Sequence, residues 1–268
     1  MRVDRNEAML RELNLYPQWT LRAPNLAPVS LAPTHTPAIE PSAQNVTVAL
    51  QPAVTDAIPT TNLPVDRESQ ESVASLITAV DFAPAKTWPE LTQQVRDCQR
   101  CGLRAGCTQT VFGVGDTQAD WLFVGDMPRA DEDGLGEPFA GEIGHLLDNM
   151  LAAMQLTRDN NVYLANVVKC RPSDDTHPAA TEIGQCLPYL QRQIELLQPK
   201  IIVALGKVAA TNLLGEDVAL DALRGVLHDY QGIPVIVTYH PAYLLRKPTA
   251  KAQAWQDLCF ALDVMSEA

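Results

Sequence analysis

Four cysteines place the strongest constraint on how this chain can fold. Cys98 and Cys101 form a C-x-x-C pair, and Cys170 and Cys186 follow far downstream. Two close thiols plus two distant ones are typical of a chain that wraps around a metal centre, and four thiolates satisfy either zinc or an iron–sulfur cluster. We therefore expect these four side chains to meet in one domain. Their spacing alone leaves the choice of metal open.

Composition narrows the class of protein. The chain has 268 residues and six cysteines, and its first residues, MRVDRNEAML, lack an apolar signal region. No run approaches the ~20 apolar residues that span a membrane. We therefore expect a cytoplasmic protein, in a compartment where paired cysteines hold metal more often than they form disulfides. If the partner is DNA, the net charge of −12 favours a small contact area with few phosphate contacts over a broad basic binding surface.

The chain divides near residue 90. All 14 glycines follow this point, and 11 of the 20 prolines precede it. Residues 23–90 have no helical or strand period over most of their length, which predicts a disordered linker. Residues 1–22 carry large apolar side chains ahead of this linker and suggest either a docking peptide with a short amphipathic helix or a frayed terminus.

Residues 91–268 alternate between strand and helix patterns. Such alternation predicts a three-layer α/β/α domain with a mainly parallel central sheet. Functional residues in such folds collect beyond the carboxyl ends of the strands. We predict strands over 119–124, 162–168, 200–205 and 234–239, and helices over 142–154, 181–197, 206–214 and 250–264.

Three loops with polar residues follow three of these strands. The first runs from Gly125 to Gly141 and is rich in glycine and acidic residues. The second begins at Asn166 and contains Cys170, and the third begins at His240. Because parallel strands end at the same edge of a sheet, these loops predict one shared site.

These loops, with the C-x-x-C-x-L start at Cys98 and the segment 111–115, resemble the family 4 uracil-DNA glycosylases, the iron–sulfur branch of that superfamily. The resemblance covers roughly residues 91–265 and includes the segments 136–139, 166–172 and 240–246. It implies a monomer with the uracil-DNA glycosylase fold. It also implies a [4Fe–4S] cluster, with zinc as the alternative, on Cys98, Cys101, Cys170 and Cys186. Cys107 and Cys259 have no place in the family pattern.

The resemblance further implies a DNA-repair hydrolase that cleaves the N-glycosidic bond of uracil, or a related deaminated base, in DNA. Such an enzyme must flip the base out of the duplex. Gly125, Phe139 and Asn166 would bind the base, with Phe139 stacking on it and Asn166 pairing with its polar edge. A carboxamide offers both a donor and an acceptor and can separate uracil from cytosine.

The same resemblance assigns the chemical roles. His240 would donate a hydrogen bond to uracil O2 as negative charge develops on the leaving base. Asp126 and Glu132 would orient water or stabilise the cationic sugar. Leu244 and Arg246 would approach the DNA where the base leaves.

Two departures leave a second function open. Family members usually have Glu at the position of Asp126 and Gly at that of Arg129. A basic residue of the family is also missing near Asp174 and Asp175. We therefore keep as an alternative a weak or inactive DNA- or replisome-binding module on the same fold. An unrelated zinc-stabilised α/β protein is the third reading.

The first residues carry a resemblance of their own. The pattern L-x-x-L-x-L-x-x-x-W-x-L-R from Leu10 to Arg22 is similar to the amino-terminal peptide of the psi subunit of the bacterial DNA polymerase III clamp loader. That peptide docks onto the chi subunit. The resemblance implies that residues 1–25 bind chi, with Trp19 as an anchor.

Overall fold

The structure is a computed structural model, and it describes residues 85–173 and 176–267. The predicted docking peptide and most of the predicted linker lie outside these residues. So do Asp174 and Asp175, the position of the missing basic residue. Expectations for these segments stay predictions.

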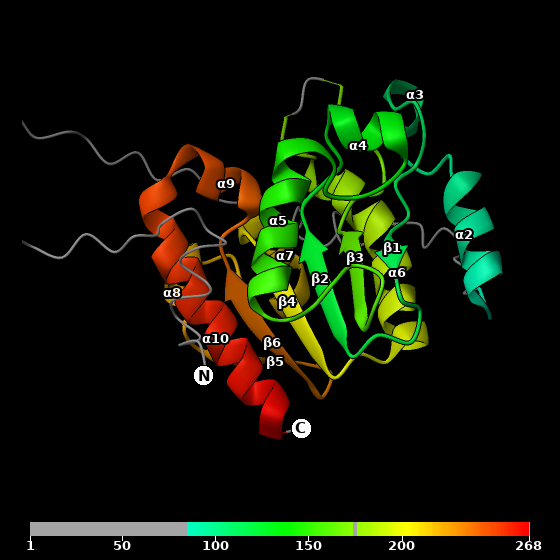
Figure 1. Ribbon diagram of the computed structural model, residues 1–268. Coiled ribbons are helices and arrows are strands. Elements are labelled where there is room, and N and C mark those ends of the chain that lie inside the picture. Colours follow the sequence, from blue (N-terminus) through cyan, green and yellow to red (C-terminus); the bar gives the residue numbers. More distant parts are fainter. Residues whose placement is uncertain (1–84, 174–175, 268) are drawn as a thin grey trace, which may run out of the picture. The chain divides into compact units, whose positions relative to one another are not determined.

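The described chain alternates between helices and strands, as the sequence predicts (Figure 1). The elements in chain order are α2 (Trp88–Arg96), α3 (Leu103–Gly106), β1 (Val114–Gly115), β2 (Trp121–Gly125), α4 (Ala130–Leu135), α5 (Gly141–Ala153), β3 (Val162–Asn166), α6 (Ala180–Leu197), β4 (Ile201–Leu205), α7 (Lys207–Leu214), α8 (Leu220–Leu223), β5 (Leu227–Tyr230), β6 (Ile233–Thr238), α9 (Pro241–Arg246), the 3-10 turn η1 (Pro248–Ala250) and α10 (Lys251–Glu267).

One sheet organises the domain, with strand order β1-β3-β2-β4-β6-β5. The four inner strands are parallel to one another, and the two edge strands β1 and β5 pair antiparallel. The predicted mainly parallel sheet is therefore confirmed. The chain leaves β2 toward β3 on one side and later returns to β4 on the other. This makes the carboxyl end of β2 the switch point at which ligands bind in such sheets.

Both faces of the sheet are covered, which gives the predicted three layers. Residues alternate along each strand, so Leu122 and Val124 pack with α2, α6 and α7, whereas Trp121 and Phe123 pack with α5, α9 and α10. Every residue of β2, β3 and β4 is buried. Strands that are buried on both faces have continuous apolar sequences, and for this reason these strands could be predicted from the sequence.

Helix α2 begins at Trp88, upstream of the boundary at residue 91 that we predicted. Thr87 caps it by accepting a hydrogen bond from the Glu90 amide at 3.4 Å, and Pro89 occupies its first turn. Leu91 and Val95 are buried within the sheet-covering core. The T-W-P-E sequence is a helix-start signal, so this element was readable from the sequence.

No helix in the described ranges is both long and apolar enough to cross a bilayer.

Candidate active site and cysteine cavity

The carboxyl ends of β2, β3 and β6 bring the predicted site residues together. Gly125 pairs in register with Asn166, so Asp126 begins its loop beside Asn166. His240 follows β6 after one intervening residue and enters α9. Helices α4 and α9 lie at this end of the sheet, the end to which the arrows of β2 and β3 point (Figure 1).

His240 is oriented by its place at the start of α9. Its Nδ1 accepts a hydrogen bond from the Ala242 amide at 3.1 Å, and Pro241 opens the helix behind it. An accepting Nδ1 carries no proton, so the neutral ring holds its proton on Nε2. That Nε2 lies 3.4 Å from Asp126 Oδ1.

Burial lowers the pKa of His240. The nearby Asp126 acts in the opposite direction, while Arg129 and Arg246 add to the lowering. The imidazole is therefore neutral at neutral pH, and it presents an N–H donor and not a full positive charge.

Asp126 is buried and is held on both carboxylate oxygens. Oδ1 accepts from the Met127 amide at 2.8 Å, and Oδ2 lies 3.5 Å from Arg129 Nη2. The two residues at which this chain departs from the family it resembles, Asp126 and Arg129, thus pair with each other. Arg129 gives Asp126 a cationic partner that a glycine could not supply.

Glu132 has a different environment from the one we expected. Its carboxylate accepts hydrogen bonds from the amide of Arg129 at 2.7 Å, from the amide of Phe139 and from Asn166 Nδ2 at 3.5 Å. Burial raises its pKa. Because both oxygens are committed within the protein, the geometry favours a positioning role over the orientation of water.

Gly125, Phe139 and Asn166 pack closely against one another, and Phe139 lies beside His240. The Phe139 ring is 1% exposed, and its centroid lies 5.7 Å from that of His240 at an interplanar angle of 30°. A Cβ on Gly125 would lie 2.4 Å from Asn166 Oδ1 and 2.6 Å from Phe139 Cζ, so only glycine fits there. Asn166 Oδ1 finds no hydrogen-bond partner among the described residues. A buried acceptor without a donor indicates that a ligand supplies one.

A cavity of about 340 Å³ opens beside Asp126 and His240. This volume lies within the range of small-molecule sites. Arg129, Lys207 and Arg246 line it and bring positive charge to a chain that is acidic overall. Gly206 turns the chain from β4 into α7 at a φ of 91°, and its missing Cβ leaves room for His240. The sequence analysis missed Lys207, although it lies two residues after the end of β4.

The predicted DNA-contacting segment needs one correction. Leu244 is 1% exposed and packs in the core under α9, so it cannot reach DNA. Its neighbour Leu245 is 39% exposed, and Arg246 is exposed and lines the cavity. The exposed apolar side chain of this segment is therefore Leu245. Helical phase, which the sequence pattern left undecided, settles which leucine faces outward.

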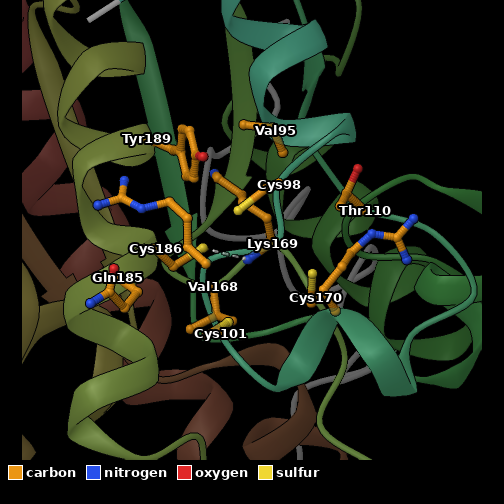
Figure 2. A pocket seen from close by; sticks show the side chains of 12 residues that line it. Val95, Cys98, Cys101, Thr110, Val168, Lys169, Cys170, Gln185, Cys186 and Tyr189 are labelled. Atoms are coloured by element: carbon orange, nitrogen blue, oxygen red, sulfur yellow. Dashed lines mark hydrogen bonds between the residues drawn. The ribbon is translucent and has the colours of Figure 1, made fainter. Parts of the chain in front are cut away.

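The four predicted metal-binding cysteines line one cavity, between α2, the 98–101 loop, the end of β3 and α6 (Figure 2). The amide of Lys169 donates to Cys186 Sγ at 3.2 Å. Within residues 85–173 and 176–267, no three His, Cys, Asp or Glu side chains form a preassembled metal-binding group. The donor set suits a metal centre, since four thiols from separate segments converge on a single cavity. Cys107 is also buried, whereas Cys259 lies on the opposite face of the sheet.

Lys169 connects this cavity to Asn166. It is 1% exposed, and its Nζ donates to the Asn166 carbonyl at 2.8 Å and to Gln193 Oε1 at 2.6 Å. Burial lowers its pKa to about 8. In the sequence, Lys169 stands between an apolar segment and Cys170, and this position could have indicated a buried lysine next to the cysteine cavity. The sequence analysis did not use this pattern.

Comparison with known proteins agrees with this geometry. The sequence profile of the uracil DNA glycosylase superfamily matches residues 112–259, which is more than half of the chain. The match contains Asp126, Phe139, Asn166 and His240.

The chain belongs to the uracil-DNA glycosylase superfamily. It is 36% identical over 176 residues to the type-4 uracil-DNA glycosylase of Archaeoglobus fulgidus, which covers 63% of this chain and 88% of that protein. It is 39% identical over 158 residues to the type-4 enzyme of Thermotoga maritima, covering 58% of this chain and 82% of that protein. A type-5 uracil-DNA glycosylase of Pyrobaculum aerophilum is 29% identical over 149 residues. The predicted family resemblance is therefore confirmed, with type-4 members among its relatives.

Proposed function

We propose that this superfamily member is a DNA-repair enzyme that hydrolyses the N-glycosidic bond of uracil in DNA. One observation carries the proposal: the buried Asn166 carboxamide has an unpaired Oδ1 beside the Phe139 ring, and that ring lies against the His240 imidazole. Uracil N3–H would supply the missing donor to Oδ1. Cytosine has no N–H at that position, so it would leave the acceptor unpaired, which costs binding energy.

The reaction breaks the bond between C1′ of the deoxyribose and N1 of uracil, and the bonding electrons leave with the base. The neutral His240 ring would turn its Nε2–H from Asp126 to uracil O2 and stabilise the developing anion. Asp126, held by the Met127 amide, would face the cationic sugar. Water then adds at C1′, and its proton passes to a carboxylate or to solvent.

We propose that Cys98, Cys101, Cys170 and Cys186 bind a [4Fe–4S] cluster. When bound, the cluster would serve as a crosslink between the 98–101 loop, the end of β3 and α6, and would not take part in hydrolysis. The converging thiols suit either metal, and the similarity to type-4 enzymes, the branch whose resemblance implies a cluster, favours iron–sulfur over zinc.

A uracil-excision assay tests the function directly. Purified protein should release uracil from a labelled oligonucleotide, and His240→Ala should slow single-turnover excision by roughly 10²-fold, since removal of one oxyanion-type donor costs that much. His228→Ala is the matched control, because His228 lies on the edge strand β5, away from the pocket. An inactive parent would reject the proposal.

Metal analysis tests the cluster. Anaerobically purified protein should contain iron and sulfide, and Cys170→Ala should lose both. Cys259→Ala, which changes a cysteine on α10, should keep them. Stoichiometric zinc without iron would contradict the assignment.

One observation favours the second candidate function, a weak or inactive DNA-binding module. Arg129 pairs with Asp126 and partly neutralises the carboxylate that hydrolysis would use. Tight binding of uracil-containing DNA without excision would identify such a module.

The replisome partner is a separate proposal. Residues 1–25 would bind the chi subunit, and the following segment would let the domain search nearby DNA at raised effective concentration. Titration of a labelled 1–25 peptide against chi tests it. Lack of saturable binding, or binding that ignores Trp19→Ala, rejects it.

A further inference from the structure

Arg158 grips the backbone of the loop that carries Phe139. Its Nη1 donates to the Pro138 carbonyl at 3.1 Å, and its Nη2 donates to the Phe139 carbonyl at 2.7 Å. Its Nε donates to Asp148 on α5, which fixes the direction of the guanidinium. One planar cation thus holds two consecutive carbonyls, a geometry that lysine cannot reproduce.

The residue it holds has an unusual backbone conformation. Phe139 has a φ of +55°, in the left-handed region that non-glycine residues seldom adopt. Such a conformation costs energy and persists only where the surroundings enforce it. Glu132 accepts a hydrogen bond from the Phe139 amide, and Arg158 donates one to the Phe139 carbonyl.

Gly144 completes this arrangement. A Cβ on Gly144 would lie 1.9 Å from the Phe139 carbonyl oxygen, so α5 approaches the loop only because glycine stands there. Arg158 does not line the cavity beside His240, and its backbone contacts are with the Pro138 and Phe139 carbonyls. We therefore expect Arg158 to act on the reaction through the position of Phe139.

We propose that Arg158 is a positioning residue that holds Phe139 in its left-handed conformation and so sets the stacking surface for the flipped base. This inference rests on the proposed function for its catalytic consequence. The enforced conformation stands on the geometry alone.

Arg158→Met tests the inference because it keeps much of the side-chain volume and removes every donor. The expected result is roughly 10-fold slower single-turnover excision, below the ~10² that a 1 Å misplacement can cost. In a Phe139→Ala background the same substitution should change excision less than ~2-fold, because contacting residues are not additive.

Arg192→Met is the matched control. Arg192 has the same side-chain exposure as Arg158, 21%, and it too binds one carboxylate, that of Glu195, with one backbone carbonyl, that of Ala85, where Arg158 binds two. It lies on α6, which covers the opposite face of the sheet from α5. Its loss should alter thermal stability and leave excision unchanged.

Hydrogen–deuterium exchange separates this inference from the proposed function. Protection of the Phe139 amide, which Glu132 accepts, should fall in Arg158→Met and stay in Arg192→Met. That result supports the positioning role even if the parent excises no uracil, in which case only the proposed function fails. Unchanged protection in Arg158→Met overturns the inference. An active parent with fully additive Arg158 and Phe139 effects also overturns it.

Discussion

Gly125→Ala offers the sharpest test of the base pocket. The added Cβ would lie 2.4 Å from Asn166 Oδ1 and 2.6 Å from Phe139 Cζ. Both atoms belong to the side chains that we assign to uracil recognition. Ordinary contact with a Cβ begins near 3.4 Å, so Asn166 Oδ1 must retreat by about 1 Å.

The size of the effect follows from that displacement. A misplacement of ~1 Å in a reacting complex can cost on the order of 10²-fold in rate, and we expect a loss of this size in excision. Overpacking of a well-filled site costs about 1–3 kcal/mol, so the protein should stay folded but less stable. Single-turnover excision on a uracil-containing oligonucleotide measures the first effect, and urea denaturation measures the second.

Gly134→Ala is the matched control on the neighbouring helix α4. A Cβ at Gly134 would meet nothing within 4 Å, and its backbone needs no left-handed conformation. The substitution should keep excision and raise stability by about 0.4–1 kcal/mol, as Gly→Ala does where the conformation is compatible. If Gly125→Ala excises uracil as fast as Gly134→Ala, the proposed pocket is wrong.

Three further predictions concern the loops around the pocket. Burial lowers the pKa of His240 from 6.5, so below about pH 6.5 the unfolded chain binds more protons at this residue than the folded protein does. The stability contribution of the neutral ring should therefore be complete above that pH and decrease as the pH falls. His240→Gln should flatten this part of a pH profile of urea denaturation, and an unchanged slope would contradict the buried neutral ring. Asp126→Glu combined with Arg129→Gly restores the family residues and frees the carboxylate from its cation, so excision should rise by roughly 10-fold at most, whereas a drop in single-turnover rate would show that the Asp126–Arg129 pair is functional. Leu245→Ala should slow excision from duplex DNA more than from single-stranded DNA and should leave stability unchanged. Leu244→Ala, which empties a core position, should lower the unfolding free energy by about 2–5 kcal/mol. If both substitutions slow excision from duplex DNA equally, the corrected assignment is wrong.

The sequence by itself determined the layers of the fold and the place of the site. A continuous apolar run such as Ile201–Leu205 can form a strand only if both faces of the sheet are covered. Such runs therefore predict a parallel sheet with helices on both sides. Asn166 ends such a run, Asp126 and His240 follow within two residues of theirs, and parallel strands end at one edge. The meeting of these residues was therefore predictable from local patterns.

The short edge strands were not predictable in this way. β1 has only Val114 and Gly115, and β5 alternates between exposed and half-buried residues. Neither contains an apolar run, and each becomes a strand because an inner strand offers it free hydrogen-bonding groups.

Tertiary structure alone decided what each site side chain does. Leu244 and Leu245 are the same residue type, and the packing of α9 against the core buries the first and leaves the second exposed. Glu132 matches a family carboxylate in the sequence, and only the structure shows that it accepts hydrogen bonds from the Phe139 amide and from Asn166. The physical reason is distance: these roles depend on contacts between side chains and backbone groups far apart along the chain, and no local pattern contains them.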